Sequence, residues 1–295
     1  MTGPQSFLRL NLKSTEAHRL SWNNQYFNLD AFLLLDKKIL SKEQAAEDLK
    51  NCSLIVKMNP FKNEFKAKLF SHILQQEKEE KSSIIAFTAS INIFENKVLD
   101  ILDIRETEGV VNSYGGVPLN ADKSVQMTLT AEEKSSLMSE LQKLVHGNMA
   151  THLRQPFVCF FPEFVTEEWR DRLPQGKSKA TLIPFQALFP FAGAIDRVFK
   201  EQFYVLDDLY CTSLTCPCNE VNGLILTIDP HTGQEVLMGG FKYNFEKKTF
   251  KPRTDIPAQM NFNAQEWCKQ FDAGQPIDLK VLFEARYHFL RKLLN

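Results

Sequence analysis

The sequence predicts an α+β fold, in which strands and helices occupy separate stretches of the chain. Short β-branched and aromatic runs separated by turn residues fill the stretch from 203 to 251, which is typical of an antiparallel meander. Two capped amphipathic segments follow between 263 and 294, and they predict helices that cover the meander. The composition, with 43% hydrophobic and 24% charged residues, is that of a folded protein.

We expect an N-terminal mixed region over residues 1–175. Its predicted strands are recognised by apolar residues that alternate or are β-branched. These strands are 7–12, 54–57, two strands within 82–104 that flank the turn at Glu95 and Asn96, and 124–129. Its predicted helices span 41–50 and a segment from Pro60 to 73 with apolar residues four apart. A helix across 94–102 is the alternative to the second strand of 82–104.

A capping box predicts a third helix in this region. The Thr130 hydroxyl and the Glu133 carboxylate can each accept a bond from a free backbone N–H, and the helix stops at Gly147. The aromatic stretch 155–164 is predicted to be β-prone, and a short helix begins at Thr166.

Residues 176–202 are expected to be an irregular, Pro- and Phe-rich connection, because Pro184 and Pro190 each remove a donor from a strand ladder. The C-terminal region, 203–295, is predicted to contain a cysteine loop, a β-meander and two helices. The strands are expected at 203–206, 221–228, 235–245 and 249–251, and the helices at 263–274 and 278–294.

Three cysteines lie within eight residues, at Cys211, Cys216 and Cys218. Three thiolates this close together in a loop can surround a soft divalent ion, and zinc prefers four such ligands in a tetrahedron. We therefore predict a zinc knuckle with one zinc per chain. The alternatives are a metal-free cluster of reduced thiols and a catalytic or redox-sensing site. The patterns of zinc deaminases and of thioredoxin-type pairs are both absent.

The fourth zinc ligand is not fixed by the spacing. We predict His288, because the last helix is expected to pack back against the meander. The alternatives are His231 at the tip of a hairpin, Cys268, Cys159, and the carboxylates of Asp207 and Asp208.

The run from Tyr210 through Cys211, Cys216 and Cys218, continuing into a hairpin and a C-terminal helix, resembles a run in uncharacterised bacterial proteins. Some of these proteins are associated with SEC-C-type zinc motifs. The resemblance covers residues 203–295 and implies metal binding at the three cysteines, with no activity attached. The SEC-C pattern itself has a Cys-Cys or Cys-His pair after its C-x-C, and no such pair follows Cys218.

A second candidate surface is the basic-aromatic hairpin, residues 242–253. Lysines and an arginine alternate there with Tyr243, Phe245 and Phe250, and cations beside exposed rings can bind phosphate and stack on bases. Arg286, Arg291 and Lys292 of the last helix could extend such a face. The alternative is an ordinary hairpin with its rings inward and its lysines outward.

The bulk properties limit the function. A formal net charge of −1 argues against a general nucleic-acid or anionic-membrane binder. The N-terminal residues lack the apolar core of a signal peptide, and no stretch is long enough to span a bilayer, so we expect a cytoplasmic protein without a membrane partner. The leading hypothesis is a non-enzymatic binding or adaptor protein with a structural zinc site and an unknown protein partner. A nucleic-acid-associated protein and an enzyme with an unrecognised site are the alternatives.

Overall fold

The computed structural model describes residues 6–10, 19–35, 37–60, 81–112, 115–118, 124–167, 169, 182–199, 202–213, 216–229, 232–256 and 263–294. The chain forms two compact units, and neither is continuous in sequence. The N-terminal unit comprises Arg9–Leu35 and Glu47–Leu153, and the C-terminal unit comprises Met1–Leu8, Asp36–Ala46 and Arg154–Asn295. The regions expected from composition, 1–175 and 203–295, are continuous stretches, so they divide the chain along different lines. Each unit combines a sheet with helices, which confirms the α+β prediction.

An eight-stranded sheet forms the N-terminal part of the fold, in the order β1-β3-β4-β5-β6-β7, with β2 beside β3 and β8 beside β6. The pairings from β2 onward are antiparallel. The strands are β1 (Ser6–Leu10), β2 (Arg19–Trp22), β3 (Gln25–Leu35), β4 (Cys52–Pro60), β5 (Lys81–Asn92), β6 (Lys97–Asn112), β7 (Gly115–Pro118) and β8 (Val125–Gln126).

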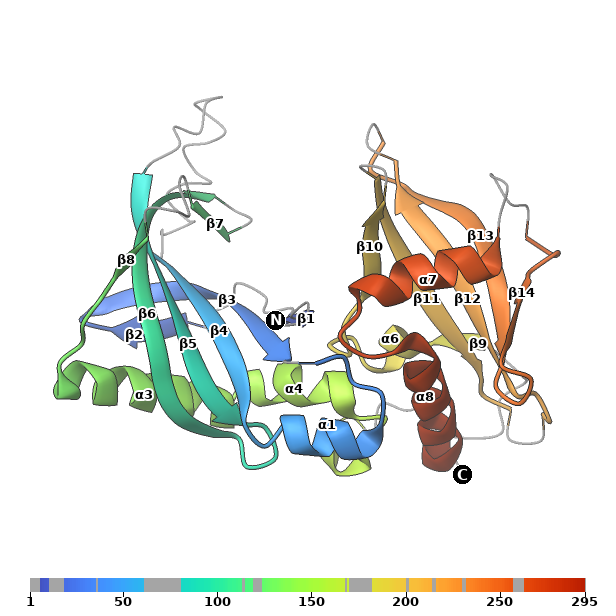
Figure 1. The fold of residues 1–295 in the computed structure, drawn as a ribbon, viewed down its shortest axis with the longest axis horizontal. Coiled ribbons are helices and arrows are strands. Elements are labelled where there is room, and N and C mark those ends of the chain that lie inside the picture. Colours follow the sequence, from blue (N-terminus) through green and yellow to red (C-terminus); the bar gives the residue numbers. More distant parts are fainter. Residues whose placement is uncertain are drawn as a thin grey trace. The chain divides into compact units, whose positions relative to one another are not determined.

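Helix α3 (Ala131–His146) packs along this sheet beside β2 and β6 (Figure 1). Its capping box is formed as predicted: the Glu133 backbone N–H donates to the Thr130 hydroxyl at 3.2 Å, and the Thr130 N–H donates to the Glu133 carboxylate at 2.9 Å. The Gln142 side-chain amide bonds the β5–β6 hairpin at its turn and at the start of β6: its Nε2 donates to the Asn96 carbonyl, and its Oε1 accepts from the Val98 N–H, each at 2.7 Å. Helices α1 (Lys42–Asp48) and α4 (Met149–Arg154) are the other α-helices among the described residues before 155.

The structure corrects two predictions here. Residues 82–104 form two strands about a tight turn, so the alternative helix at 94–102 is wrong. The stretch 155–164 is not β-structure but contains 3-10 turns at Gln155–Phe157 and Pro162–Phe164, because its prolines cannot donate to a ladder. Pro60 is the last residue of β4, and the rest of the helix predicted to follow it lies outside the described residues.

The C-terminal unit is built on an antiparallel meander, as predicted, in the order β10-β11-β12-β13-β14, with β9 beside β11. It begins one strand earlier than expected, within the segment predicted to be irregular. The strands are β9 (Leu182–Pro184), β10 (Ile195–Phe199), β11 (Gln202–Cys211), β12 (Glu220–Ile228), β13 (Glu235–Asn244) and β14 (Thr249–Pro252), and a short helix α6 (Phe185–Leu188) follows β9.

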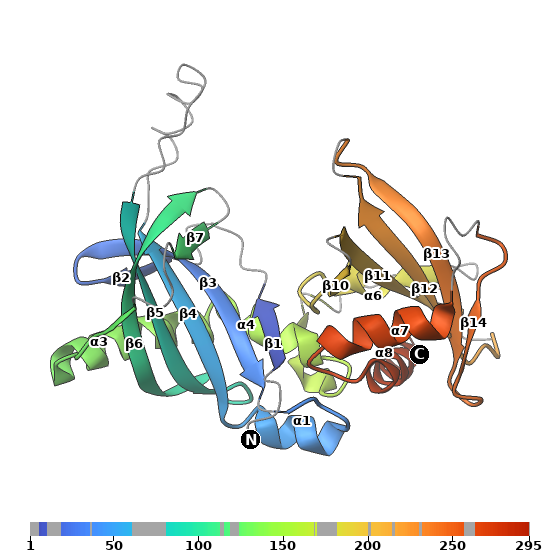
Figure 2. The same ribbon diagram turned by 45° about the horizontal axis from the view of Figure 1, so that its top comes forward.

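Two helices, α7 (Ala264–Gly274) and α8 (Leu279–Leu294), cover one face of the meander, as predicted (Figure 2). Trp267 of α7 packs edge-on against Tyr204 of β11, with ring centroids 4.9 Å apart. Phe283 of α8 lies against Phe241 and Tyr243 of β13. Among the described helices, none has both the length and the apolar composition needed to cross a membrane.

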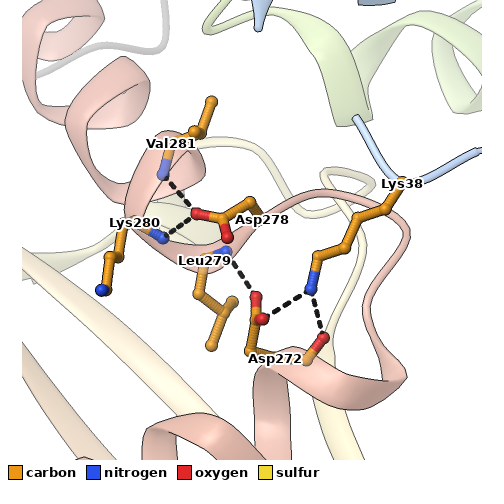
Figure 3. Close-up of polar contacts among 6 residues, drawn as sticks. All are labelled: Lys38, Asp272, Asp278, Leu279, Lys280 and Val281. Carbon is orange, nitrogen blue, oxygen red and sulfur yellow. Dashed lines mark hydrogen bonds and ion pairs between the residues drawn. The ribbon is translucent and has the colours of Figure 1, made fainter. Parts of the chain in front are cut away.

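The start of α8 is fixed by two aspartates (Figure 3). Asp278 caps the helix, because its carboxylate accepts from the N–H groups of Lys280 at 3.0 Å and Val281 at 3.1 Å. Asp272, in the last turn of α7, accepts from the Leu279 N–H at 2.8 Å. The turn between the two helices is therefore closed from both sides.

A segment far away in the sequence is tied to the same turn. The Lys38 ammonium contacts both the backbone carbonyl and the carboxylate of Asp272, each at 2.6 Å (Figure 3). Ile39 forms a parallel bridge with Ile277, in which the Ile39 N–H donates to Pro276 O at 2.9 Å. The segment around Lys38 thus belongs structurally to the C-terminal helices.

Helix α8 also carries a buried cation. The Arg286 guanidinium donates twice to the Asp208 carboxylate of β11, at 2.9 and 2.8 Å, and the two side chains are 2% and 3% exposed. The Tyr210 hydroxyl donates to the same carboxylate at 2.7 Å. The guanidinium lies 4.3 Å from the centre of the Phe185 ring. This group fixes α8 against the centre of the sheet.

Candidate metal centre

The three clustered cysteines lie at one end of the β11–β12 hairpin. Cys211 is the last residue of β11, and the antiparallel register pairs Leu209 with Asn222, so the end of β11 faces the start of β12. Cys218 is two residues before β12 begins at Glu220. The loop between the strands folds back so that the Sγ atoms of Cys211, Cys216 and Cys218 lie within 4.8 Å of one another. All three side chains are half-buried, and Pro217 between two of them is exposed.

Helix α8 anchors this loop through two side chains one turn apart. The Tyr287 hydroxyl donates to the Cys218 carbonyl at 2.6 Å. The Arg291 guanidinium donates to the carbonyls of Ser213, at 2.7 Å, and Cys216. It also lies 5.4 Å from the centre of the Tyr287 ring, a cation–π distance. The loop is therefore held by protein hydrogen bonds on its inner side.

Arg291 also brings a positive charge to the sulfur atoms. Its Nη2 lies 3.9 Å from the Cys218 Sγ. A guanidinium beside thiols stabilises their anionic form, which is the form that binds metals. Neither Tyr287 nor the particular role of Arg291 was predicted from sequence. The only signal was their i, i+4 spacing, which places two side chains on one face of a helix.

The thiols influence one another's protonation. Hydrogen bonds from the Cys218 side chain and backbone hold the pKa of Cys216 below its ordinary value. Partial burial and the two neighbouring thiols raise the pKa of Cys218 to about 12. Of these two thiols, Cys216 therefore loses its proton more readily, and Cys218 keeps its proton more strongly.

The residues predicted as a fourth ligand lie elsewhere. His288 is exposed on α8 beside Tyr287, and it is not part of the group of converging ligand atoms. Cys159 and Cys268 are buried outside that group, and Asp208 is bound to Arg286. His231 lies outside the described residues. The structure thus brings together three of the four predicted ligands.

The basic-aromatic hairpin, residues 242–253, has its rings turned inward. Tyr243 and Phe245 are buried, and Phe250 stacks on Tyr243 with ring centroids 4.5 Å apart. Lys248 pairs with Glu284, and Arg253 donates to Asp255 at 3.1 Å. Buried rings cannot stack on bases, so this geometry matches the ordinary-hairpin alternative.

Two residues named with that surface have other partners. Arg286 is buried with Asp208, and Arg291 is bound to the cysteine loop. Both guanidinium groups therefore bind within the protein, whereas a nucleic-acid interface would need them to face the phosphate backbone.

No family model, no curated protein and no solved structure matches its sequence or its fold.

Proposed function

We propose that Cys211, Cys216 and Cys218 hold one zinc ion, and that the protein acts by binding a partner rather than by catalysis. The observation that carries the metal site is the convergence of the three Sγ atoms within 4.8 Å of one another. Zinc–sulfur bonds of about 2.3 Å in a tetrahedron put sulfur atoms about 3.8 Å apart, so a small contraction of the loop is sufficient.

The charges around the cluster support zinc. Three thiolates and Zn²⁺ together carry one negative charge, and the Arg291 guanidinium near Cys218 offsets it. Hydrogen bonds from outside the ligand set, such as this one, orient the ligands and increase metal affinity. Because the loop is anchored in this way, the three thiols already lie close together before the metal binds.

A structural role fits better than a catalytic one. Among the described residues, the converging group contains sulfur ligands and no carboxylate or imidazole that could act as a general base beside the metal. The loop joins β11 to β12 and contacts α8, so a bound zinc would cross-link the sheet and its covering helix. A rigid C-terminal unit of this kind is suited to presenting a surface to a protein partner.

The metal content of the purified protein tests the site. We expect one zinc per chain by inductively coupled plasma mass spectrometry in the wild type, and none in Cys216→Ser. The Cys268→Ala variant is the matched control, because it removes a cysteine outside the group. Cys216→Ser should also melt several degrees lower, since structural zinc contributes directly to folding. A wild-type protein without zinc, or one whose zinc survives Cys216→Ser, contradicts the proposal.

A further inference from the structure

Among the described residues, the zinc site proposed above has three ligands, whereas zinc is four-coordinate in nearly all structural sites. Within the described residues, the converging group ends at Cys211, Cys216 and Cys218. His288 is exposed on α8 and is not in that group. Three protein ligands are the arrangement by which proteins leave a coordination position for a molecule from solution.

The cluster is accessible to such a molecule. Each of the three cysteines is half-buried and Pro217 is exposed, so the group lies at the surface of the C-terminal unit. Its inner side is occupied by the backbone bonds from Tyr287 and Arg291. A ligand from solution can reach the cluster without displacing these anchors.

The surroundings favour an anionic, soft ligand. The Arg291 Nη2 lies 3.9 Å from the Cys218 Sγ, so an added anion next to the cluster would gain from the guanidinium charge. Thiolates are the soft anions that zinc binds best in a sulfur-rich site. A thiol therefore fits this position better than a carboxylate or an alcohol.

We propose that the fourth position of the proposed zinc site binds an exogenous thiolate, supplied by a small-molecule thiol. The exchange is a ligand substitution without a redox change. The thiol loses its proton to solvent, its sulfur forms a bond to zinc, and the water that occupied the position is released.

Cobalt substitution makes this step visible, because thiolate-to-cobalt absorption scales with the number of bound thiolates. The zinc protein is exchanged with Co²⁺ in a buffer whose reductant is a phosphine rather than a thiol, and is then titrated with 2-mercaptoethanol. Ethylene glycol, which has the same skeleton without sulfur, is the control ligand. We expect the absorption to rise by about one third, from three thiolates to four, with one cobalt per chain retained and no change with ethylene glycol.

The results separate this proposal from the one on which it rests. If Co²⁺ does not bind, the metal site itself is absent. If Co²⁺ binds but 2-mercaptoethanol leaves the spectrum unchanged, or removes the metal, the site is closed and the thiolate proposal is wrong. His288→Ala is made in parallel: we expect its cobalt spectrum to equal that of the wild type, and a shifted spectrum would identify the imidazole as the fourth ligand instead.

Two variants of Arg291 test whether its charge favours thiolate binding. Arg291→Gln should weaken binding of 2-mercaptoethanol several-fold. Arg291→Lys should weaken it less, because lysine keeps the charge although it cannot replace both guanidinium bonds to the loop carbonyls. Equal binding in Gln and Lys variants that still hold one cobalt per chain would show that the guanidinium does not select the ligand.

Discussion

Replacing Asp208 by Asn leaves the Arg286 guanidinium charged in the core of the C-terminal unit, without a carboxylate to balance it. Asp208 accepts three hydrogen bonds, two from Arg286 and one from the Tyr210 hydroxyl. Asn can accept through its carbonyl oxygen only, and its amide N–H groups would face these donors. The substitution keeps the shape of the side chain, so the loss is electrostatic.

The magnitude follows from the burial. Both side chains of the pair are 3% exposed or less, so solvent cannot screen the unpaired cation. Removing one partner of a buried pair costs about 3–5 kcal/mol in the free energy of unfolding. For a domain of about 150–250 residues this lowers the melting temperature by roughly 6–20 °C.

Urea unfolding measures this effect. We would use a Trp22→Phe background, so that the remaining tryptophans, Trp169 and Trp267, report on the C-terminal unit alone. Arg286→Met and the double variant with Asp208→Asn complete a cycle. Because the double variant buries no unpaired charge, we expect it to be about 2–3 kcal/mol more stable than the sum of the single effects predicts. If Asp208→Asn costs less than about 1 kcal/mol, or if the two effects add, the pair does not stabilise the fold as argued.

Three further changes test other parts of the C-terminal unit. Burial, and after it the acidic neighbours, raises the pKa of Asp207, so the charged carboxylate destabilises the fold above this raised pKa. Below about pH 3 the carboxyl is protonated in both the folded and the unfolded state, and the effect disappears. In urea titrations, Asp207→Asn should therefore stabilise the protein at pH 7 and have no effect at pH 3. Gly223→Ala places a Cβ 2.4 Å from the Phe241 ring and should lower the free energy of unfolding by about 1–3 kcal/mol. Adding Phe241→Leu in the same chain should reduce this loss, and an additive loss would contradict the steric explanation. Asp278→Ala removes the cap of α8 and should cost about 1 kcal/mol, whereas Asp278→Ser should retain most of the stability, and equal losses in both would exclude capping as the cause.

The sequence predicted those elements whose signals are local. The capping box at Thr130, the capped helix expected at 263–274 and the meander from Val221 onward each depend on neighbours a few residues apart. Each was confirmed, and the cap of the helix at 263–274 is the Asn263 side chain. Strand β3 was missed although its first half alternates, with Phe27 and Leu29 buried. The continuous apolar run at 31–35 hides the alternation in its second half. The prediction of β-structure at 155–164 was wrong because it gave the aromatic residues of this stretch more weight than its prolines.

The candidate metal site also combines features that are local in the sequence with features that are not. The three cysteines are close in sequence, so their convergence was foreseeable from the spacing alone. Tyr287 and Arg291 reach the loop from α8, about 70 residues further along, and nothing local in the sequence shows that contact. The prediction of His288 followed from the expected packing of α8 against the meander. Which side chains of that helix reach the loop also depends on its rotation, which places Tyr287 and Arg291 there and leaves His288 exposed.

The contact between Lys38 and Asp272 has a consequence for synthesis of the chain. The two residues are 234 positions apart, and at about 5–20 residues per second the ribosome needs on the order of 10–50 s to make the intervening stretch. The N-terminal unit, whose last segment ends at Leu153, is complete well before that. During this interval Ile39 has no Ile277 to pair with, so its backbone N–H and C=O groups gain their native partners, Pro276 and Asp278, only after α7 and the turn that follows it have been made.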